Sequence, residues 1–190
     1  SYKNIDSRDL KQNLRDFIKE IMPVAEENNI KMGIHPDDPP IPLFGVPRIV
    51  STMDDYKYIL DSYDSSCNGM TFCAGSIASN FYNDIYDIFN KFKKRVNFIH
   101  LRNVKKDKDR KSFYESNHLK GDVDFVKLIK MILKEEKNRS KIKKIEIPMR
   151  PDHGHSLLDD QNKKNFNPGY TAIGRLMGLS ELRGIIKAVS

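Results

Sequence analysis

The sequence has little cysteine and no long hydrophobic run. Cys67 and Cys73 are the two cysteines among 190 residues, too few for a disulfide framework, so we expect free thiols in a reducing compartment. Apolar runs last only a few residues, well short of the roughly 20 that span a bilayer. The opening residues, SYKNIDSRDL, lack a basic and then apolar signal segment. These absences predict no membrane partner and a cytoplasmic location.

Positive charge is in excess, and its placement bears on possible partners. The formal net charge is +7, from 33 Lys and Arg against 26 Asp and Glu. An anionic partner such as nucleic acid is one explanation. However, the basic residues concentrate at 105–111 and 134–144, where acids or Asn interrupt them and no aromatic residue is interleaved. We interpret both stretches as solvated segments and predict no nucleic-acid partner.

Hydrophobic periodicity predicts helices that alternate with short strands. Helices are expected at 7–29, 51–63, 80–92, 123–137 and 171–189, and strands at 30–34, 69–72, 96–101 and 144–149. We expect Asp122 to cap the fourth helix and a long charged loop to precede it. A leading helix followed by four β-loop-α units predicts parallel strands joined by right-handed crossovers. The predicted fold class is α/β, in a single domain over residues 1–190.

Each predicted strand runs out into a residue that can bind a metal. In chain order these residues are His35, Cys73, His100 and Asp152. The carboxyl ends of parallel strands share one edge, which is where ligands bind in α/β sheets and barrels. Two imidazoles, a thiolate and a carboxylate suit a borderline divalent ion such as iron(II), manganese or zinc. The sequence therefore predicts a metal site at this edge.

Each of these residues also has a simpler explanation. A His at a strand end can be a hydrogen-bonded polar residue, and Cys73 between Phe72 and Ala74 can be a small buried apolar residue. His153 and His155 can be surface imidazoles of a turn. The joint pattern favours the metal site, because all four candidates fall at the same end of four successive units.

Two arginines accompany the predicted ligands. Because alternate residues along a strand share a face, Arg102 is expected to point the same way as His100, and Arg150 the same way as Asp152. Arginines beside a metal suit a substrate carboxylate, which they can hold in a bidentate pair. The alternative for each is a salt bridge at the rim of the sheet.

Six segments of the sequence resemble one enzyme family closely. They are GIHPDDPPIPLFGVPRIVST (33–52), NGMTFCAGS (68–76), FIHLRN (98–103), HLKGDVD (118–124), IPMRPDHGH (147–155) and NPGYTAIGRLMGLSELRG (167–184). The sequence is similar in these segments to mannonate dehydratase. The resemblance implies a (β/α)8 TIM barrel of the xylose-isomerase-like group. It also implies a lyase that removes water from D-mannonate to give 2-dehydro-3-deoxy-D-gluconate in hexuronate (glucuronate) breakdown.

The resemblance also implies roles for individual residues. A Mn²⁺ or Fe²⁺ ion would be held at the positions of His35, Cys73, His100 and Asp152, with His153 and Tyr170 as the acid–base residues. Removing a proton next to a carboxylate builds negative charge, which a divalent cation and an arginine can stabilise. The sequence leaves open which of His153 and Tyr170 is the base.

The resemblance covers only the C-terminal half of the family's chain. About four βα units are present, whereas a closed barrel of this type has eight strands, so a partial barrel with unpaired edges is expected. The chain can be a fragment, a natural short protein, or a half-barrel that pairs with another half, including a second copy of itself. Two other functions stay open, an inactive metal-binding half-barrel and another metal-dependent barrel enzyme, an isomerase or a nuclease. Five His are few for a multi-metal nuclease.

Overall fold

Four short strands form a parallel sheet at the centre of the molecule. The computed structural model describes residues 5–141, 146–162, 164–165 and 167–190. In spatial order the strands are β1 (Met32–Ile34), β2 (Asn68–Cys73), β3 (Val96–His100) and β6 (Met149–Arg150), and each pairs in parallel with its neighbour. The predicted α/β class with parallel strands is confirmed.

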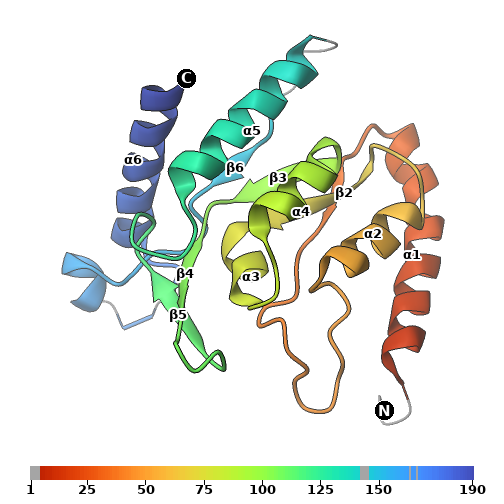
Figure 1. The fold of residues 1–190 in the computed structure, drawn as a ribbon, viewed down its shortest axis with the longest axis horizontal. Helices are drawn as coiled ribbons and strands as arrows, with labels where there is room; N and C mark the ends of the chain where they lie inside the picture. Colours follow the sequence, from red (N-terminus) through yellow and green to blue (C-terminus); the bar gives the residue numbers. More distant parts are fainter. Residues whose placement is uncertain (1–4, 142–145, 163, 166) are drawn as a thin grey trace.

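The helices lie around the sheet, with α1 at the right of Figure 1 and α6 at the left. They are α1 (Ser7–Glu27), α2 (Met53–Asp61), α3 (Ala74–Ser79), α4 (Ile85–Phe92), α5 (Phe125–Ser140) and α6 (Ala172–Val189), with short 3-10 turns at Lys93–Arg95 and Leu158–Asn162. Asp6 caps α1 by accepting from the backbone of Arg8 and Asp9, and Thr52 caps α2 through Asp55. The predicted helices at 7–29, 51–63 and 171–189 are confirmed within a few residues.

Three predicted elements differ from the structure. The helix expected at 80–92 begins only at Ile85, after its cap at Asp84, and a separate helix that was not predicted, α3, precedes it directly after β2. The helix expected at 123–137 is present as α5, but its cap is Asp124 and not Asp122, whose carboxylate accepts from the backbone N–H of Lys106 at 2.9 Å. The strand expected at 144–149 falls partly outside the described residues, and its described part is confined to β6.

The predicted charged loop is largely a β-hairpin. Strands β4 (Asn103–Lys106) and β5 (Phe113–Ser116) pair in antiparallel fashion, separate from the parallel sheet. The charged residues between them form the turn, which the backbone N–H of Asp107 helps close by donating to the carbonyl of Ser112 at 2.9 Å. The hairpin extends from the end of β3 (Figure 1), so its second strand is presented beside the carboxyl edge of the sheet.

The core lies between the sheet and its helices. It is built from apolar side chains of the strands and of the helices that cover them, such as Met70, Phe72 and Ile99 with Ile88 and Phe89. The Phe72 and Phe89 rings meet edge to face with centroids 5.2 Å apart. This packing fixes the ends of β2 and β3, and with them the side chains at the carboxyl edge.

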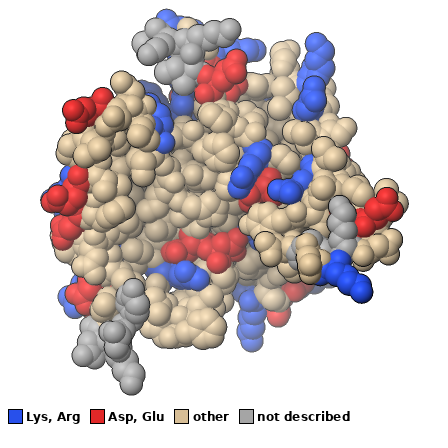
Figure 2. Space-filling view, turned by 180° about the vertical axis from the view of Figure 1, so that it is seen from behind, with Lys and Arg blue, Asp and Glu red and all other residues tan. Residues whose placement is uncertain are grey.

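Charged side chains of both signs share one face of the molecule. On the face shown in Figure 2, Lys and Arg are interspersed with Asp and Glu and separated by neutral surface. Interspersed charge of this kind is typical of a solvated surface. Among the described residues, none of the helices combines the length and the hydropathy needed to cross a bilayer.

Candidate functional site

Three of the four predicted metal ligands lie together at the carboxyl edge of the sheet. His35 follows β1, Cys73 ends β2 and His100 ends β3, and one ligand atom from each lies within 4.8 Å of the others. The strand register explains this, because Cys73 and His100 are directly paired between β2 and β3. Two imidazoles and a thiol are a donor set that fits a borderline divalent cation.

The surroundings of the cluster favour ligand binding. The His35 Nδ1 lies 2.7 Å from the Pro36 carbonyl, so this nitrogen donates and leaves the Nε2 lone pair facing the cluster, 3.2 Å from His100 Nδ1. Cys73 is fully buried, and Ser76 Oγ lies 3.1 Å from its sulfur. We refer to His35, Cys73 and His100 as the three-residue cluster.

Asp152 lies against this cluster on the His100 side. Its Oδ2 is 3.4 Å from His100 Nδ1, and its Oδ1 accepts from Arg150 at 2.8 Å. The residue is buried and has a φ of 68°, in the left-handed region that Asp tolerates better than most residues. The backbone at this point therefore turns the carboxylate back toward the strand ends.

His153 and Tyr170 are in direct contact. The Nε2 of His153 lies 3.0 Å from the Tyr170 hydroxyl, and the two rings meet edge to face. Their segments are held together because the Gly154 N–H donates to the Gly169 carbonyl at 2.8 Å. His153 Nε2 is also 3.6 Å from Asp152 Oδ2, so this pair adjoins the metal-ligand candidates.

The structure gives Arg102 two acidic partners. Its guanidinium forms ion pairs with Asp38 and with Glu115, and its Nε donates to Glu115 Oε1 at 2.7 Å. Burial alone would lower the pKa of Arg102, but the two carboxylates outweigh it and raise the pKa above its usual range. The side chain is 6% exposed, so the residue predicted to bind substrate is also a buried link between the Pro-rich loop and strand β5.

Arg150 is differently placed. Its side chain is 53% exposed, contacts Asp152 and lies over the Phe98 ring at 5.7 Å. A guanidinium with this exposure at the carboxyl edge can still take an incoming carboxylate. Of the two predicted arginines, Arg150 is therefore the accessible one.

Two acidic residues at the site were not predicted from the sequence. Asp38 lies three residues after His35 in the Pro-rich loop, and that proximity to a predicted ligand was an available signal. Glu115 lies on β5, within a segment interpreted as a charged loop, so no pattern singled it out. Its Oε1 lies 2.9 Å from His153 Nδ1.

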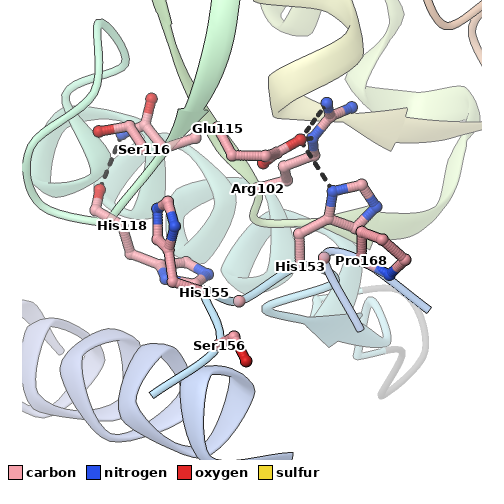
Figure 3. Close-up of a pocket in the computed structure, with 11 residues that line it drawn as sticks. Arg102, Glu115, Ser116, His118, His153, His155, Ser156 and Pro168 are labelled. Carbon is pink, nitrogen blue, oxygen red and sulfur yellow. Dashed lines mark hydrogen bonds and ion pairs between the residues drawn. The ribbon is translucent and has the colours of Figure 1, made fainter. Parts of the chain in front are cut away.

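A pocket of about 200 Å³ opens beside these residues (Figure 3). Arg102 and Glu115 lie along one side of it, with His153 next to them, and His118 lies on the far side. His118 is buried, and its Nε2 lies 3.2 Å from the Pro151 carbonyl, next to Asp152. The segment that follows the hairpin is thus tied to the segment that carries Asp152 and His153.

The burial of His118 predicts an acid-sensitive fold. Burial lowers the pKa of His118, and the contact with Pro151 offsets this only partly. Below pH about 6.5 the unfolded chain therefore binds a proton more readily than the folded chain, so stability is full above this pH and falls as the pH drops below it. Urea unfolding at pH 7.5 and 5.5 should show this loss, and His118→Gln should reduce the difference. An unchanged difference in the variant contradicts the assignment.

Comparisons with known proteins complete the description of the site. A family model described as D-mannonate dehydratase (UxuA) matches residues 1–190. The chain belongs to the D-mannonate dehydratase family. The resemblance seen in the sequence is thereby confirmed. Mannonate dehydratase 2 of Agrobacterium fabrum is 49% identical over 190 residues, and mannonate dehydratase of Chromohalobacter salexigens is 47% identical over 188 residues.

A solved structure has the same fold. The crystal structure of mannonate dehydratase from Streptococcus suis serotype 2 superposes with a TM-score of 0.87 at 38% sequence identity, and it matches 98% of this chain. The chain spans about half the length of the D-mannonate dehydratases that it matches, covering 47% of the Agrobacterium protein and 51% of the Streptococcus chain.

Proposed function

We propose that the chain carries the metal site and the acid–base residues of a lyase that removes water from D-mannonate to give 2-dehydro-3-deoxy-D-gluconate. The observation that carries this proposal is the juxtaposition of the three-residue cluster with the His153–Tyr170 pair. Asp152 joins the two, with 3.4 Å to His100 and 3.6 Å to His153. Family membership supports the choice of reaction and of substrate.

His35, Cys73, His100 and Asp152 would hold the cation, which we propose to be Mn²⁺ or Fe²⁺. The mixed set of imidazole, thiolate and carboxylate supports either ion. When bound, the cation supplies a fixed positive charge beside the negative charge that develops when the substrate loses its C2 proton. Arg150 is placed to bind the substrate carboxylate from the open side of the site.

The dehydration needs one group that accepts a proton and one that donates a proton. One member of the His153–Tyr170 pair takes the proton from C2, and the other gives a proton to the departing C3 hydroxyl, which leaves as water. The 3.0 Å contact between His153 Nε2 and the Tyr170 hydroxyl then lets one proton pass between them. The pair returns to its starting protonation state, so no further reactant is required.

We further propose that residues 1–190 form one domain, the C-terminal half of a (β/α)8 barrel. Four parallel strands with crossover helices support this arrangement, as does the match with about half of each relative. Among the described residues, β1 and β6 are the edge strands of the sheet. A second half-barrel, either the family's N-terminal half or another copy of this chain, would cover these edges.

The proposed reaction predicts a selective loss of turnover in two variants. With D-mannonate and Mn²⁺ or Fe²⁺, the 190-residue chain should form the keto-deoxy acid. His153→Gln and Tyr170→Phe should lower kcat about 10²–10⁴-fold, because each removes one proton-transfer group. Bound metal per chain should stay the same. Tyr82→Phe removes the hydroxyl of a tyrosine that is 90% exposed and serves as the matched control.

The second candidate is a half-barrel that binds metal without turnover. The open edges of the sheet favour it, because substrate contacts from four further strands would be missing. Metal bound without product supports this candidate. Product that appears only after addition of the N-terminal half of the Agrobacterium relative would assign the activity to the completed barrel.

A further inference from the structure

A single carboxylate oxygen joins the acid–base pair to the buried arginine. Oε1 of Glu115 lies 2.9 Å from His153 Nδ1 and accepts from Arg102 Nε at 2.7 Å. Figure 3 shows Glu115 reaching from the hairpin toward both side chains. The side chain is 31% exposed, so these contacts are only partly shielded from water.

The contacts determine the ionisation of Glu115. Burial alone would raise its pKa, but the hydrogen bonds from His153 and Arg102 outweigh this and hold the pKa below its usual range. Glu115 is therefore a carboxylate at neutral pH, and a carboxylate only accepts hydrogen bonds.

An acceptor at this position determines the tautomer of His153. Since Glu115 cannot donate, the Nδ1 of His153 must carry the proton that forms the 2.9 Å hydrogen bond. In a neutral ring Nε2 then has a free lone pair, which can accept from the Tyr170 hydroxyl 3.0 Å away. One hydrogen-bonded chain thus runs from Glu115 through His153 to Tyr170.

Arg102 anchors this chain to the loop that carries His35. Its guanidinium pairs with Asp38, three residues beyond His35, and with Glu115 on β5. The Arg102 side chain can pass close to α3 because Gly75 has no side chain. A Cβ at Gly75 would lie 2.7 Å from the Arg102 side chain. The metal-binding loop and the hairpin are therefore held at a fixed separation.

We propose that Glu115 is a positioning residue for the dehydration, which holds His153 in the Nδ1–H tautomer and directs Nε2 at the Tyr170 hydroxyl. This inference rests on the proposed function and extends it to a residue on the hairpin. Hydrogen-bond partners of this kind fix the ring orientation and the tautomer of functional histidines.

The tautomer can be measured without turnover. In the ¹⁵N-labelled, metal-free chain, one-bond proton couplings report which ring nitrogen of each histidine is protonated, and His153→Gln identifies the His153 signals. We expect Nδ1–H for His153 in the wild type. Glu115→Ala should lose this signal, whereas Glu115→Gln should keep it, because its amide oxygen can replace Oε1 in both contacts. Tyr114→Ala, an exposed neighbour on β5, is the control.

The variants also separate positioning from structure. If Glu115 serves only as a charge partner of Arg102, Glu115→Gln and Glu115→Ala should be equally impaired. As a positioning residue, its change to Ala should lower kcat about 10–100-fold with little change in KM, and Gln should restore most of the rate. An Nε2–H tautomer in the wild type overturns the inference, even if Glu115→Ala fails to fold. A chain that does not dehydrate mannonate overturns the proposed function, and the tautomer comparison still decides on Glu115.

Discussion

Replacing Cys73 with serine should abolish stoichiometric metal binding. The Cys73 sulfur is fully buried and belongs to a group of ligand atoms that lie within 4.8 Å of one another. A serine hydroxyl stays protonated at neutral pH and is a poor ligand where a thiolate is lost. Even changes to residues behind the ligands cost 10–100-fold in affinity, so we expect a loss of at least about 100-fold. Elemental analysis after dialysis against Mn²⁺ or anaerobic Fe²⁺ measures the bound metal per chain.

The chain supplies a matched control for this experiment. Cys67 is also buried, at 6% exposure, but it lies at the other end of β2, one residue before the strand begins. Cys67→Ser should destabilise the fold through the same buried hydroxyl while it leaves the metal content unchanged. Full metal content in Cys73→Ser, or equal losses in both variants, would contradict the proposed site.

The part of the site that the sequence predicts is the part set by strand ends. His35, Cys73 and His100 each follow or end a strand, and parallel pairing brings the ends of neighbouring strands together without any further information. The direct pairing of Cys73 with His100 is the clearest case. For these residues the local pattern and the sheet topology together are sufficient.

Residues whose positions depend on long-range contacts could not be predicted in this way. The strands of the β4–β5 hairpin have four residues each and flank a charged turn, so the alternation is too short to outweigh the charge. Glu115 therefore had no assigned position. The same limit applies to α3, whose residues are buried on all sides and show no amphipathic period.

The orientation of Arg102 illustrates a different limit. Alternation along a strand predicts that Arg102 shares a face with His100, but β3 ends at His100 and the chain enters the hairpin at Asn103. Beyond a strand end the two-residue period no longer fixes direction. The direction of Arg102 is instead set by Asp38 in the Pro-rich loop and by Glu115 on β5, two segments that lie far apart in the sequence.

Replacing Gly174 with alanine should be the most destabilising small substitution near the site. Gly174 lies in the first turn of α6 and packs on the backbone of residues 154–155. A Cβ at Gly174 would lie 2.0 Å from the His155 carbonyl oxygen and 2.8 Å from the Gly154 carbonyl carbon, and these backbone atoms cannot move independently. We expect a loss of about 3 kcal/mol in the free energy of unfolding, measured by urea denaturation.

The same substitution should also disturb the acid–base pair, because α6 holds the segment that carries His153. The hydroxyl of Thr171, which precedes α6, donates to the His155 carbonyl at 2.7 Å. The Gly154 N–H donates to the carbonyl of Gly169, the residue before Tyr170. Gly184→Ala, on the same helix but with no atom within 4 Å of its added Cβ, is the control. It should stabilise the helix by about 1 kcal/mol and leave turnover unchanged. Equal stability changes in the two variants would show that α6 does not pack closely against residues 154–155.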